Sequence, residues 1–597
     1  SLNLDFANTK ALDPRITYTR GSTATYYDGK TLAKAEENLL EYSQEFDNAA
    51  WVKQRATVTA NADTAPDGTT TADALLQATG QTTFGNAVRA IPVAAGDHVF
   101  SVFAKPNGKN FIILQEQMSD GAIRRTWFNV STGAVGTTDA NHTATITAST
   151  NGYYRCSILF TVDAARTASA NGFGLADTDG STTVADDGNG LYLWGAQLEQ
   201  RSALTDYTAT TDQPITNYIP ALQTAASGEP RFDHDPITGE SKGFLIEEQR
   251  TNLLTYSEQF DNAAWTKVRS SIVANTVVAP DGTLTGDKLV EDTTASNTHN
   301  NFQAGITIVS GANYTASIYS KAAERPNIFL KFYEQSNASN NVQGIFYTDG
   351  TSPSVTANGS GTAFVSASSE EVGNGWYRHT MTGSLTTTAA AIQVFLHNGT
   401  TTNYTGDGYS GIYIWGAQLE AGSFPASYIP TVASQVTRSP DTASMTGTNF
   451  SSWYRQDEGT MFVDYSKYVV SASQNSLMAA FISDNSLNNF IKIGNNYQGV
   501  LNDFRIAVGG AAVVAITGGT TLTDYQKKVF AFKVNDAVAY VDAGLIGTDS
   551  SLTMPTVSQI NIGARNGNAE ILNGHIKKLA FWPKRLSNAT LQALTEE

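Results

Sequence analysis

The sequence contains one cysteine, Cys156, in a chain of 597 residues. A single cysteine can form no disulfide within the chain, and it excludes a zinc site built from cysteine ligands. Its neighbours in YYRCSILF are mostly apolar or aromatic, so we expect Cys156 to be a small core residue. Stability must then come from burial and hydrogen bonding, with oligomerisation or hard metal ions as further sources.

Charged residues are also scarce, at 16% of the chain where about 25% is usual. Lys and Arg number 38 against 55 Asp and Glu, which gives a formal net charge of −17, and there is no basic block. Nucleic acid is therefore not an expected partner, because a phosphate backbone needs a cationic face. The abundant Thr, Ser, Asn, Ala and Gly are typical of an all-β secreted or virion surface.

Long hydrophobic runs are missing as well. The run Ala511 to Ile516 is among the longest, whereas a membrane-spanning helix needs about 20 residues. The start of the sequence, SLNLDFANTK, has no basic stretch followed by an apolar one and no small-residue cleavage pattern. We therefore expect neither a signal peptide nor insertion into a membrane.

An internal repeat is the clearest feature that is present. The segment NLLEYSQEFDNAAW at 38–51 returns as NLLTYSEQFDNAAW at 252–265, with 11 of 14 positions identical. Each copy later ends in WGAQLE, at Glu199 and at Glu420. The spacing between the copies drifts along the chain while the landmarks persist, which indicates a shared strand scaffold with loops of different length.

Each copy is predicted to form one domain, over residues 38–212 and 252–431. Short alternating stretches such as HVFSVFAK and YTASIYSK are separated by clusters of Gly, Asn, Asp and Thr, which is a strand pattern. Many evenly spaced antiparallel strands must close or double up to hide their edges. We therefore predict an all-β protein in which each copy is a jelly-roll β-sandwich.

A third unit is predicted over residues 440–597. It contains further short strands at regular spacing, including EGTMFVDYS, KVFAFKVND and HIKKLAFWP. It ends in RLSNATLQALTEE, the one convincing helix signal. Ser587 is the expected N-cap, because a serine oxygen can accept the free amides of the first turn, and Leu591 and Leu594 follow at i, i+3 spacing.

The strand order of this third unit resembles the concanavalin-A-like/laminin-G-like fold, and GHIKKLAFWPKRLSNATLQALTEE looks like the closing strand and helix of such domains in bacteriophage tail proteins. The segments LDFANTKALDPRITYTRGSTATYYDG and GEPRFDHDPITGESKGFLIEEQRTNLL resemble consecutive parts of a preamble in phage structural proteins. In that family the preamble precedes carbohydrate-binding-module-like domains that begin NLLxYSExFxNAAW and end WGAQLE. The resemblance implies tandem jelly rolls followed by a concanavalin-A-like sandwich.

The two pieces of the preamble, residues 1–37 and 213–251, are adjacent in the family pattern but are separated here by the first repeat. The first repeat therefore looks like an insertion. A domain whose first and last strands lie close together can be inserted with little strain. We predict that residues 1–37 pack near residues 215–250 and do not form a free arm.

Carboxylates recur at equivalent positions of the two copies. They are Asp67, Asp73 and Glu199 in the first copy, and Asp281, Asp287 and Glu420 in the second. One interpretation is a structural Ca²⁺ ion in each copy, because oxygen ligands suit a hard cation and domains similar to these often carry one. The spacing matches no EF-hand loop. In the other interpretation the aspartates of the PDGT motifs lie in turns, and Asp73 and Asp287 accept hydrogen bonds from backbone amides.

Glycan recognition needs aromatic faces on which a sugar ring packs, with polar groups nearby for its hydroxyls. The tryptophans that recur in both copies are expected to be core residues: Trp51 with Trp265, and Trp194 with Trp415. Aromatic residues without such a match are better candidates for sugar contacts, although packing stays open for them. The candidates are Trp127, Trp376, its counterpart Tyr153, and the neighbouring Tyr377.

Catalytic motifs are not recognisable. The histidines show no HExxH motif or ligand-like spacing, and there is no GxSxG elbow and no phosphate-binding glycine loop. The paired carboxylates of a glycosidase cannot be recognised from sequence, because the distance between them in space determines whether they can act as a catalytic pair. His234, in RFDHDP, is expected to form hydrogen bonds without a catalytic role. We expect no enzymatic activity.

The resemblance implies a phage virion adhesin, a tail fibre or receptor-binding protein that recognises host-surface polysaccharide through non-catalytic sandwiches. Its expected location is the phage tail, and its other partners are virion proteins and further copies of itself, with a trimer expected. Two alternatives stay open. One is a polysaccharide depolymerase or glycosidase with appended binding domains, and the other is a purely structural virion spacer or decoration protein.

Overall fold

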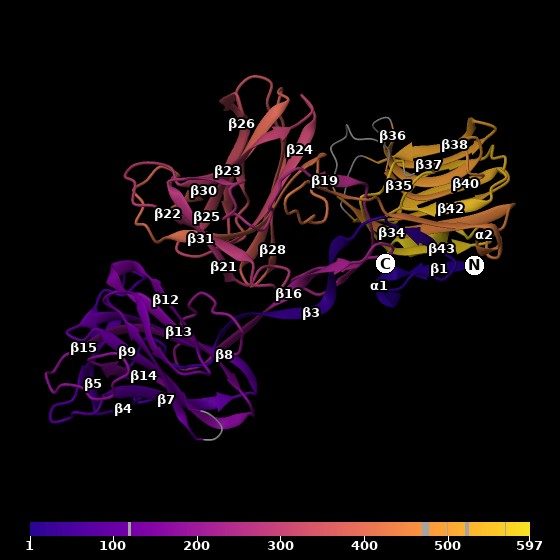
Figure 1. The fold of residues 1–597 in the computed structure, drawn as a ribbon. Coiled ribbons are helices and arrows are strands. Elements are labelled where there is room, and N and C mark those ends of the chain that lie inside the picture. The colour runs from indigo at the N-terminus through magenta and orange to yellow at the C-terminus, as the bar shows by residue number, and fades with distance from the viewer. Residues whose placement is uncertain (118–120, 469–476, 498–499, 520–524, 567–568, 597) are drawn as a thin grey trace.

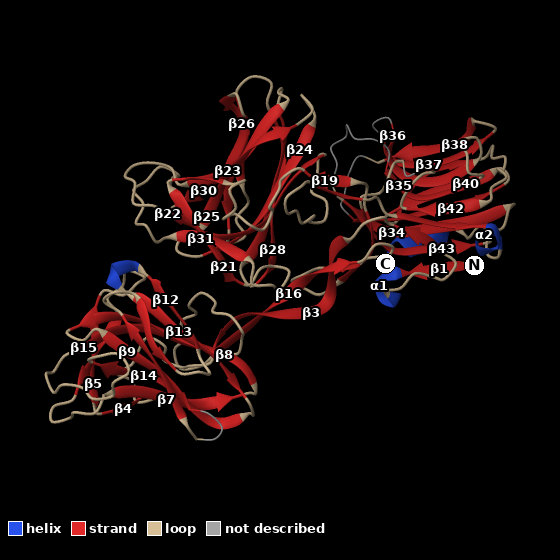
Figure 2. Ribbon diagram, viewed as in Figure 1, coloured by secondary structure: helices blue, strands red, loops and turns tan. Residues whose placement is uncertain are grey.

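The structure, a computed structural model, describes residues 1–117, 121–468, 477–497, 500–519, 525–566 and 569–596. Figure 1 shows three β-rich bodies, which we name sandwich 1 (residues 38–212), sandwich 2 (residues 252–431) and the terminal sandwich. Strands form nearly all of their regular structure (Figure 2), so the predicted all-β fold is confirmed. The helical segments of the described residues are short, and none of them is long and apolar enough to cross a membrane. They are α1 (Phe6–Thr9), η1 (Thr150–Gly152), α2 (Gly447–Ser451) and α3 (Asn588–Glu596).

Sandwich 1 consists, over its described residues, of two antiparallel sheets. The first has the order β11 (Ala134–Thr138), β10 (Ile123–Asn129), β9 (Phe111–Gln117), β14 (Arg166–Ala176), β7 (Asn86–Val93), β4 (Val52–Gln54). The second has the order β12 (Thr143–Ala148), β13 (Tyr154–Val162), β8 (Gly96–Asn107), β15 (Gly190–Glu199), β6 (Ala72–Gln77), β5 (Ala56–Asp63). Trp51 and Cys156 are 1% and 0% exposed in its core, as predicted.

Sandwich 2 repeats this arrangement strand for strand. Its first sheet has the order β27 (Ser354–Asn358), β26 (Asn337–Tyr347), β25 (Asn327–Glu334), β30 (Ala389–His397), β23 (Asn300–Thr307), β20 (Thr266–Val268). Its second sheet has the order β28 (Ala363–Gly373), β29 (Trp376–Ser384), β24 (Asn313–Ala322), β31 (Gly411–Ala421), β22 (Gly286–Glu291), β21 (Ser270–Val277). The repeat in the sequence is therefore a repeat of one fold.

The asparagine of the repeated NLL motif closes each sandwich. Asn38 Nδ2 donates to the carbonyls of Ala196 (3.0 Å) and Thr208 (2.9 Å). Asn252 Nδ2 donates in the same way to the carbonyls of Ala417 (3.1 Å) and Ile429 (2.9 Å). This side chain ties the start of each copy to its last strand and exit loop, which brings the two ends of the domain together as an insertion requires.

The terminal sandwich draws strands from three separate segments of the chain. One sheet has the order β17 (Phe232–His234), β18 (Ser241–Ile246), β43 (Gly574–Trp582), β34 (Glu458–Lys467), β39 (Tyr525–Lys533), β40 (Asp536–Val541), β41 (Gly544–Asp549), and β1 (Leu2–Asp5) also pairs with β43. The other has the order β2 (Thr17–Thr19), β33 (Thr442–Thr446), β42 (Gln559–Ile562), β35 (Leu477–Ser483), β36 (Phe490–Tyr497), β37 (Val500–Val508), β38 (Ala511–Gly518).

This body extends beyond the predicted range 440–597. The physical reason is burial: Leu4, Phe6, Phe244 and Ile246 are 0–3% exposed and belong to the core between its two sheets. Both pieces of the preamble therefore complete the terminal sandwich. A short two-stranded sheet, β19 (Arg250–Asn252) with β32 (Val436–Arg438), then links it to sandwich 2.

A long two-stranded ribbon connects sandwich 1 to the rest of the protein (Figure 1). It consists of β3 (Ala24–Asn38) and β16 (Ile215–Ala225), which pair antiparallel from Ala24 opposite Ala225 to Asn38 opposite Ile215. The Tyr27 amide also donates to Asp233 Oδ1 (2.8 Å). The prediction that residues 1–37 pack near residues 215–250 is confirmed.

The predicted C-terminal helix is confirmed as α3. Ser587 Oγ accepts a hydrogen bond from the Thr590 amide (3.2 Å), which is the expected N-cap contact. Leu591 is 0% exposed and packs with Leu594 against the outer face of the sheet that contains β39 and β40.

Candidate functional site

The four aromatic residues predicted to contact sugar are buried. Trp376 and Tyr153 are 0% and 1% exposed, and Trp127 and Tyr377 are each 8% exposed. The indole Nε1 of Trp376 donates to the Val278 carbonyl (3.0 Å) inside the protein. A sugar cannot stack on a ring that is covered by protein, so the prediction of sugar contacts at these residues is corrected to the packing role that had stayed open.

Asp73 and Asp287, which occupy equivalent positions in the two copies, accept hydrogen bonds from backbone amides, as the second interpretation states. Asp287 accepts from the amides of Phe260 (2.9 Å) and Asn275 (3.0 Å), and Asp73 accepts the equivalent pair in sandwich 1. Burial raises the pKa of Asp287 to about 6 and also raises the pKa of Asp73. Both carboxylates therefore tie loops to the edge of a sandwich.

The other four carboxylates also have protein partners. Asp67 and Asp281 accept from the amides of the threonines two residues on, each at 2.9 Å, which is a turn contact. Glu199 and Glu420 are 0% exposed, and each accepts an amide from the loop that follows its strand. Among the residues that the structure describes, no group of three or more His, Cys, Asp or Glu side chains could hold a metal ion. The predicted ligand sets are therefore not brought together.

Replacing Asp287 with Ala tests this assignment. The change leaves the buried Phe260 amide without an acceptor, and the amide of the exposed Asn275 also loses its partner. We therefore expect a loss of about 1–3 kcal/mol in the stability of sandwich 2. Thermal unfolding measured with calcium and with a chelator should show the same loss in both. A melting temperature that depends on calcium in the wild type but not in Asp287→Ala would instead support a calcium site.

A cavity of about 460 Å³ lies where β3, sandwich 2 and the terminal sandwich meet. Strand β3 contributes Tyr27, and the adjoining segment of the preamble contributes Asp233 and Lys242. Sandwich 2 contributes Arg378 of β29, and the terminal sandwich contributes His575 of β43. Because these residues come from four segments, only the assembled protein forms the cavity, which we name the junction cavity.

Aromatic rings supply much of the lining of the junction cavity. Phe424 and Tyr468 are stacked, with ring centroids 5.6 Å apart and an angle of 12° between the ring planes. Tyr319 and Tyr428 lie 5.9 Å apart edge to face. Rings fixed in this way present apolar surface without losing conformational freedom when a ligand arrives.

Polar atoms without protein partners lie among these rings. Tyr27 Oη, Arg378 Nε and His234 Nε2 are buried and have no hydrogen-bond partner among the described residues. His234 Nδ1 is 3.0 Å from the Phe232 carbonyl and 3.2 Å from the Tyr27 carbonyl, so His234 does form the expected hydrogen bonds. Buried polar atoms that lack a partner are unfavourable unless a ligand or water satisfies them.

Asp233 fixes one wall of the junction cavity. Its Oδ1 accepts the Tyr27 amide (2.8 Å), and its Oδ2 lies 2.9 Å from His575 Nε2. Burial would raise the pKa of Asp233, but the hydrogen bond with His575 and the charges around it outweigh burial, and the pKa is lowered. Asp233 is therefore ionised at neutral pH and holds the ribbon against the terminal sandwich.

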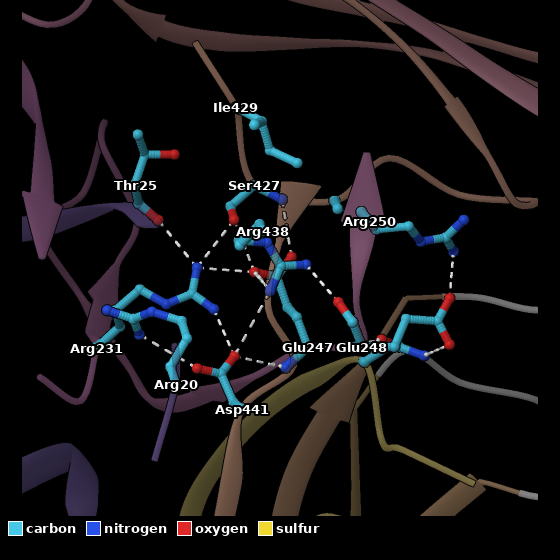
Figure 3. Close-up of polar contacts among 12 residues, drawn as sticks. Arg20, Thr25, Arg231, Glu247, Glu248, Arg250, Ser427, Ile429, Arg438 and Asp441 are labelled. Atoms are coloured by element: carbon cyan, nitrogen blue, oxygen red, sulfur yellow. Dashed lines mark hydrogen bonds and ion pairs between the residues drawn. The ribbon is translucent and has the colours of Figure 1, made fainter. Parts of the chain in front are cut away.

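A buried ion cluster lies beside the cavity and joins the segment that leads into the ribbon, the second part of the preamble and the exit of sandwich 2 (Figure 3). Asp441 is 2.6 Å from Arg231 Nη2 and 3.2 Å from Arg20 Nη1, and Glu247 is 2.7 Å from Arg231 Nη1. Arg438 lies 3.5 Å from Glu247, which therefore has two cationic partners, Arg231 and Arg438. Burial would raise the pKa of Glu247, but Arg438 and Arg231 outweigh it and hold the pKa well below its usual range.

The cluster also fixes the loop that lines the cavity. Ser427, in the exit loop of sandwich 2, donates its amide and its hydroxyl to Glu247, each at 2.7 Å. Arg231 Nη1 donates to the Ser427 hydroxyl (2.9 Å) and to the Thr25 carbonyl of β3 (3.1 Å). The walls of the junction cavity are therefore held in place before any ligand binds.

No protein-family model and no curated protein matches this chain. Among solved structures, it is similar to the CBM40 of the Ruminococcus gnavus IT-sialidase, at 12% identity and a TM-score of 0.21, over 24% of this chain and 84% of that chain. It is also similar to the CBM22-1–CBM22-2 tandem domain of Paenibacillus barcinonensis Xyn10C, at 12% identity and a TM-score of 0.20, over 65% and 99%. The LG1-3 region of the laminin alpha2 chain is 9% identical with a TM-score of 0.19, over 84% and 96%. Similarity at this level gives no information on which residues bind a ligand.

Proposed function

We propose that this protein is a phage virion adhesin, a tail fibre or receptor-binding protein that binds host-surface polysaccharide without cleaving it. The virion role rests on the resemblance of the preamble, the WGAQLE ends and the closing strand and helix. The observation that carries glycan binding is the junction cavity of about 460 Å³. It combines fixed aromatic faces with buried polar atoms that have no hydrogen-bond partner in the described part of the protein.

These two properties match the surface of a sugar. The C–H groups of a pyranose pack on aromatic rings, and its hydroxyls need donors and acceptors. The volume lies within the ~300–1,000 Å³ of small-ligand sites. Ser366 and Ser368 of the edge strand β28 are exposed and line the cavity, so a polymer can enter from that side.

We also propose that the protein lies in the phage tail, contacts other virion proteins and forms a homo-oligomer, with a trimer expected. One cavity of this size holds only a short part of a polysaccharide. Several copies on one virion would bind a repeating polymer more tightly than one copy, because the second binding event takes place at high local concentration.

The test is binding of the intact protein to an array of bacterial surface polysaccharides, with a parallel assay for released reducing ends. We expect binding without cleavage. Release of reducing ends would instead support a depolymerase or glycosidase. Binding to virion proteins alone, with no glycan bound, would support a spacer or decoration protein. A chelator arm tests the calcium interpretation, since loss of binding on chelation would support a bound ion.

A pair of variants locates the site. Ser366→Trp places a large side chain at the rim of the junction cavity, and we expect it to weaken glycan binding at least tenfold. Thr143→Trp is the matched control, because Thr143 lies at the equivalent exposed position of the edge strand β12 in sandwich 1. Equal binding by both variants and the wild type would place the glycan site elsewhere.

A further inference from the structure

We infer that the junction cavity selects an acidic glycan, and that a sugar carboxylate is bound by Arg378 together with the phenol groups of Tyr27 and Tyr319. This inference rests on the proposed function, since it names the chemical class of the glycan at the same site. The argument depends on which polar groups of the cavity are already used by the protein and which are not.

Arg378 is anchored on one side only. Its Nη2 donates to the Ala426 carbonyl (2.8 Å) and to Ser317 Oγ (3.3 Å), and the guanidinium lies 5.6 Å over the ring of Tyr319. Its Nε has no partner in the part of the chain that the structure describes. The protein leaves this donor of Arg378 unpaired, as it does the Nε of Arg155 in sandwich 1, and guanidinium pairs with carboxylates are the strong, geometrically specific ones.

Two phenol groups add further donors. Tyr27 Oη is buried and has no hydrogen-bond partner within the described ranges, and Tyr319 lines the same cavity. Burial raises the pKa of both tyrosines, so both stay protonated and can donate at neutral pH. A carboxylate offers two oxygens that only accept hydrogen bonds, which is the complement of this group of donors.

Both acidic side chains that line the cavity, Asp233 and Glu370, have a basic partner. Both oxygens of Asp233 are used, by the Tyr27 amide and by His575. Glu370 is exposed at the rim, 3.8 Å from Lys242, which itself adds a positive charge to the entrance. The groups that remain unsatisfied in the interior are therefore mainly donors.

His234 belongs to the wall of the cavity and has one unpaired ring nitrogen among the described residues. Its Nδ1 faces two carbonyls, so the proton lies on Nδ1 in the neutral ring, and Nε2 carries the lone pair. Because this edge of the ring packs against Gly29, the groups assigned to the ligand are Arg378 and the two phenols. The ligand of this chemistry is a sugar acid within a polysaccharide, with a carboxylate and a hydroxyl on the same residue.

The internal repeat supplies a matched control. Arg155 occupies the position of Arg378 in sandwich 1, where it donates to the Thr205 carbonyl (2.8 Å) and to Ser101 Oγ (3.1 Å) and lies 5.1 Å over Phe103. Phe103 has no hydroxyl where sandwich 2 has Tyr319. Arg155→Lys therefore measures the structural effect of the substitution without touching the junction cavity.

The experiment compares each acidic polysaccharide of the array in its native form and after chemical reduction of its carboxyl groups to alcohols. We expect the wild type to bind the native form at least tenfold more tightly, because a hydrogen bond to a charged group contributes about 1.5–3 kcal/mol. Tyr27→Phe removes only the unpaired hydroxyl, so it should weaken binding to the native form about fivefold or more without lowering the melting temperature. Arg378→Lys should weaken it further, and Arg155→Lys should not.

The outcomes separate this inference from the proposed function. Equal binding to native and reduced polysaccharide, with no effect of Tyr27→Phe, overturns the carboxylate assignment but leaves glycan binding intact. A preference of the wild type for neutral polysaccharides would likewise overturn the carboxylate assignment and leave glycan binding intact. Absence of binding to every glycan overturns both. If Arg378→Lys lowers stability more than Arg155→Lys, Tyr27→Phe alone decides the assignment.

Discussion

Asp441→Asn is expected to destabilise the protein by about 3–5 kcal/mol, the usual effect of removing one member of a buried ion pair. Asp441 is 0% exposed and lies between Arg20 and Arg231, at 3.2 and 2.6 Å. The amide of an asparagine carries no charge to balance either guanidinium. Arg20 would stay buried without a carboxylate partner among the described residues, and Arg231 would keep only Glu247 of its two.

The same carboxylate also serves as an acceptor for neutral groups. The Tyr18 hydroxyl donates to its Oδ1 (2.5 Å), and the Glu247 amide donates to its Oδ2 (2.9 Å). These contacts join the N-terminal segment, the second part of the preamble and the strand that follows sandwich 2. We therefore expect the variant to loosen the junction between the ribbon, sandwich 2 and the terminal sandwich, and to lower the melting temperature of the protein.

Asp457→Asn is the control for charge removal. Asp457 pairs with Arg455 at the surface, where their side chains are 61% and 50% exposed, and such pairs contribute at most about 1 kcal/mol. Calorimetry should resolve a large shift for Asp441→Asn and almost none for Asp457→Asn. Limited proteolysis should cut the variant near residues 20–25 and 425–440. Equal melting of the two variants would contradict the role assigned to the ion cluster.

The sandwiches could be predicted from sequence because their signals are local. Alternating residues such as those of HVFSVFAK reveal a strand within eight positions, and the repeated NLL and WGAQLE motifs bound each copy. The terminal helix was equally accessible, since Ser587 and Leu591 lie within one turn. Each of these predictions depends on neighbours in the chain, whose geometry the backbone fixes.

The junction depends on pairings between distant segments, which no local pattern shows. Strand β1 pairs with β43, and Tyr27 of β3 meets Arg378 of β29 at the cavity. The sequence contains a partial signal, because the arginine recurs in NGYYR and NGWYR, at Arg155 and Arg378. The two arginines have different surroundings, however, and only the assembled protein shows that Arg378 borders the junction cavity and Arg155 does not.

Residue type alone could not separate ligands from structural groups. An aspartate suits a calcium ion and a backbone amide equally well, and at Asp287 the structure shows two backbone amides that donate to the carboxylate. An unmatched tryptophan suits a sugar and a core equally well, and the 0% exposure of Trp376 decides that case. The deciding property in both is the direction in which the side chain lies relative to solvent.

Trp376→Ala is expected to cost about 3–5 kcal/mol, the range for removing a large aromatic side chain from a core. Trp376 packs in a cluster with Val278 of sandwich 2 and with Ala35 and Ile219 of the ribbon. Its removal would leave a void at the contact between these two parts. The melting transition of sandwich 2 should therefore shift strongly, and its contact with the ribbon should weaken.

Trp376→Phe separates volume from the hydrogen bond to the Val278 carbonyl. Phenylalanine retains much of the buried apolar area and loses the indole donor, so we expect a loss of about 1–2 kcal/mol, well below that of alanine. This order, alanine much worse than phenylalanine, is the signature of a packing residue, and thermal unfolding of both variants measures it. A sugar-stacking residue behaves differently, because alanine would then abolish glycan binding at an unchanged melting temperature. That result would place Trp376 in a binding groove and contradict the burial on which the packing assignment rests.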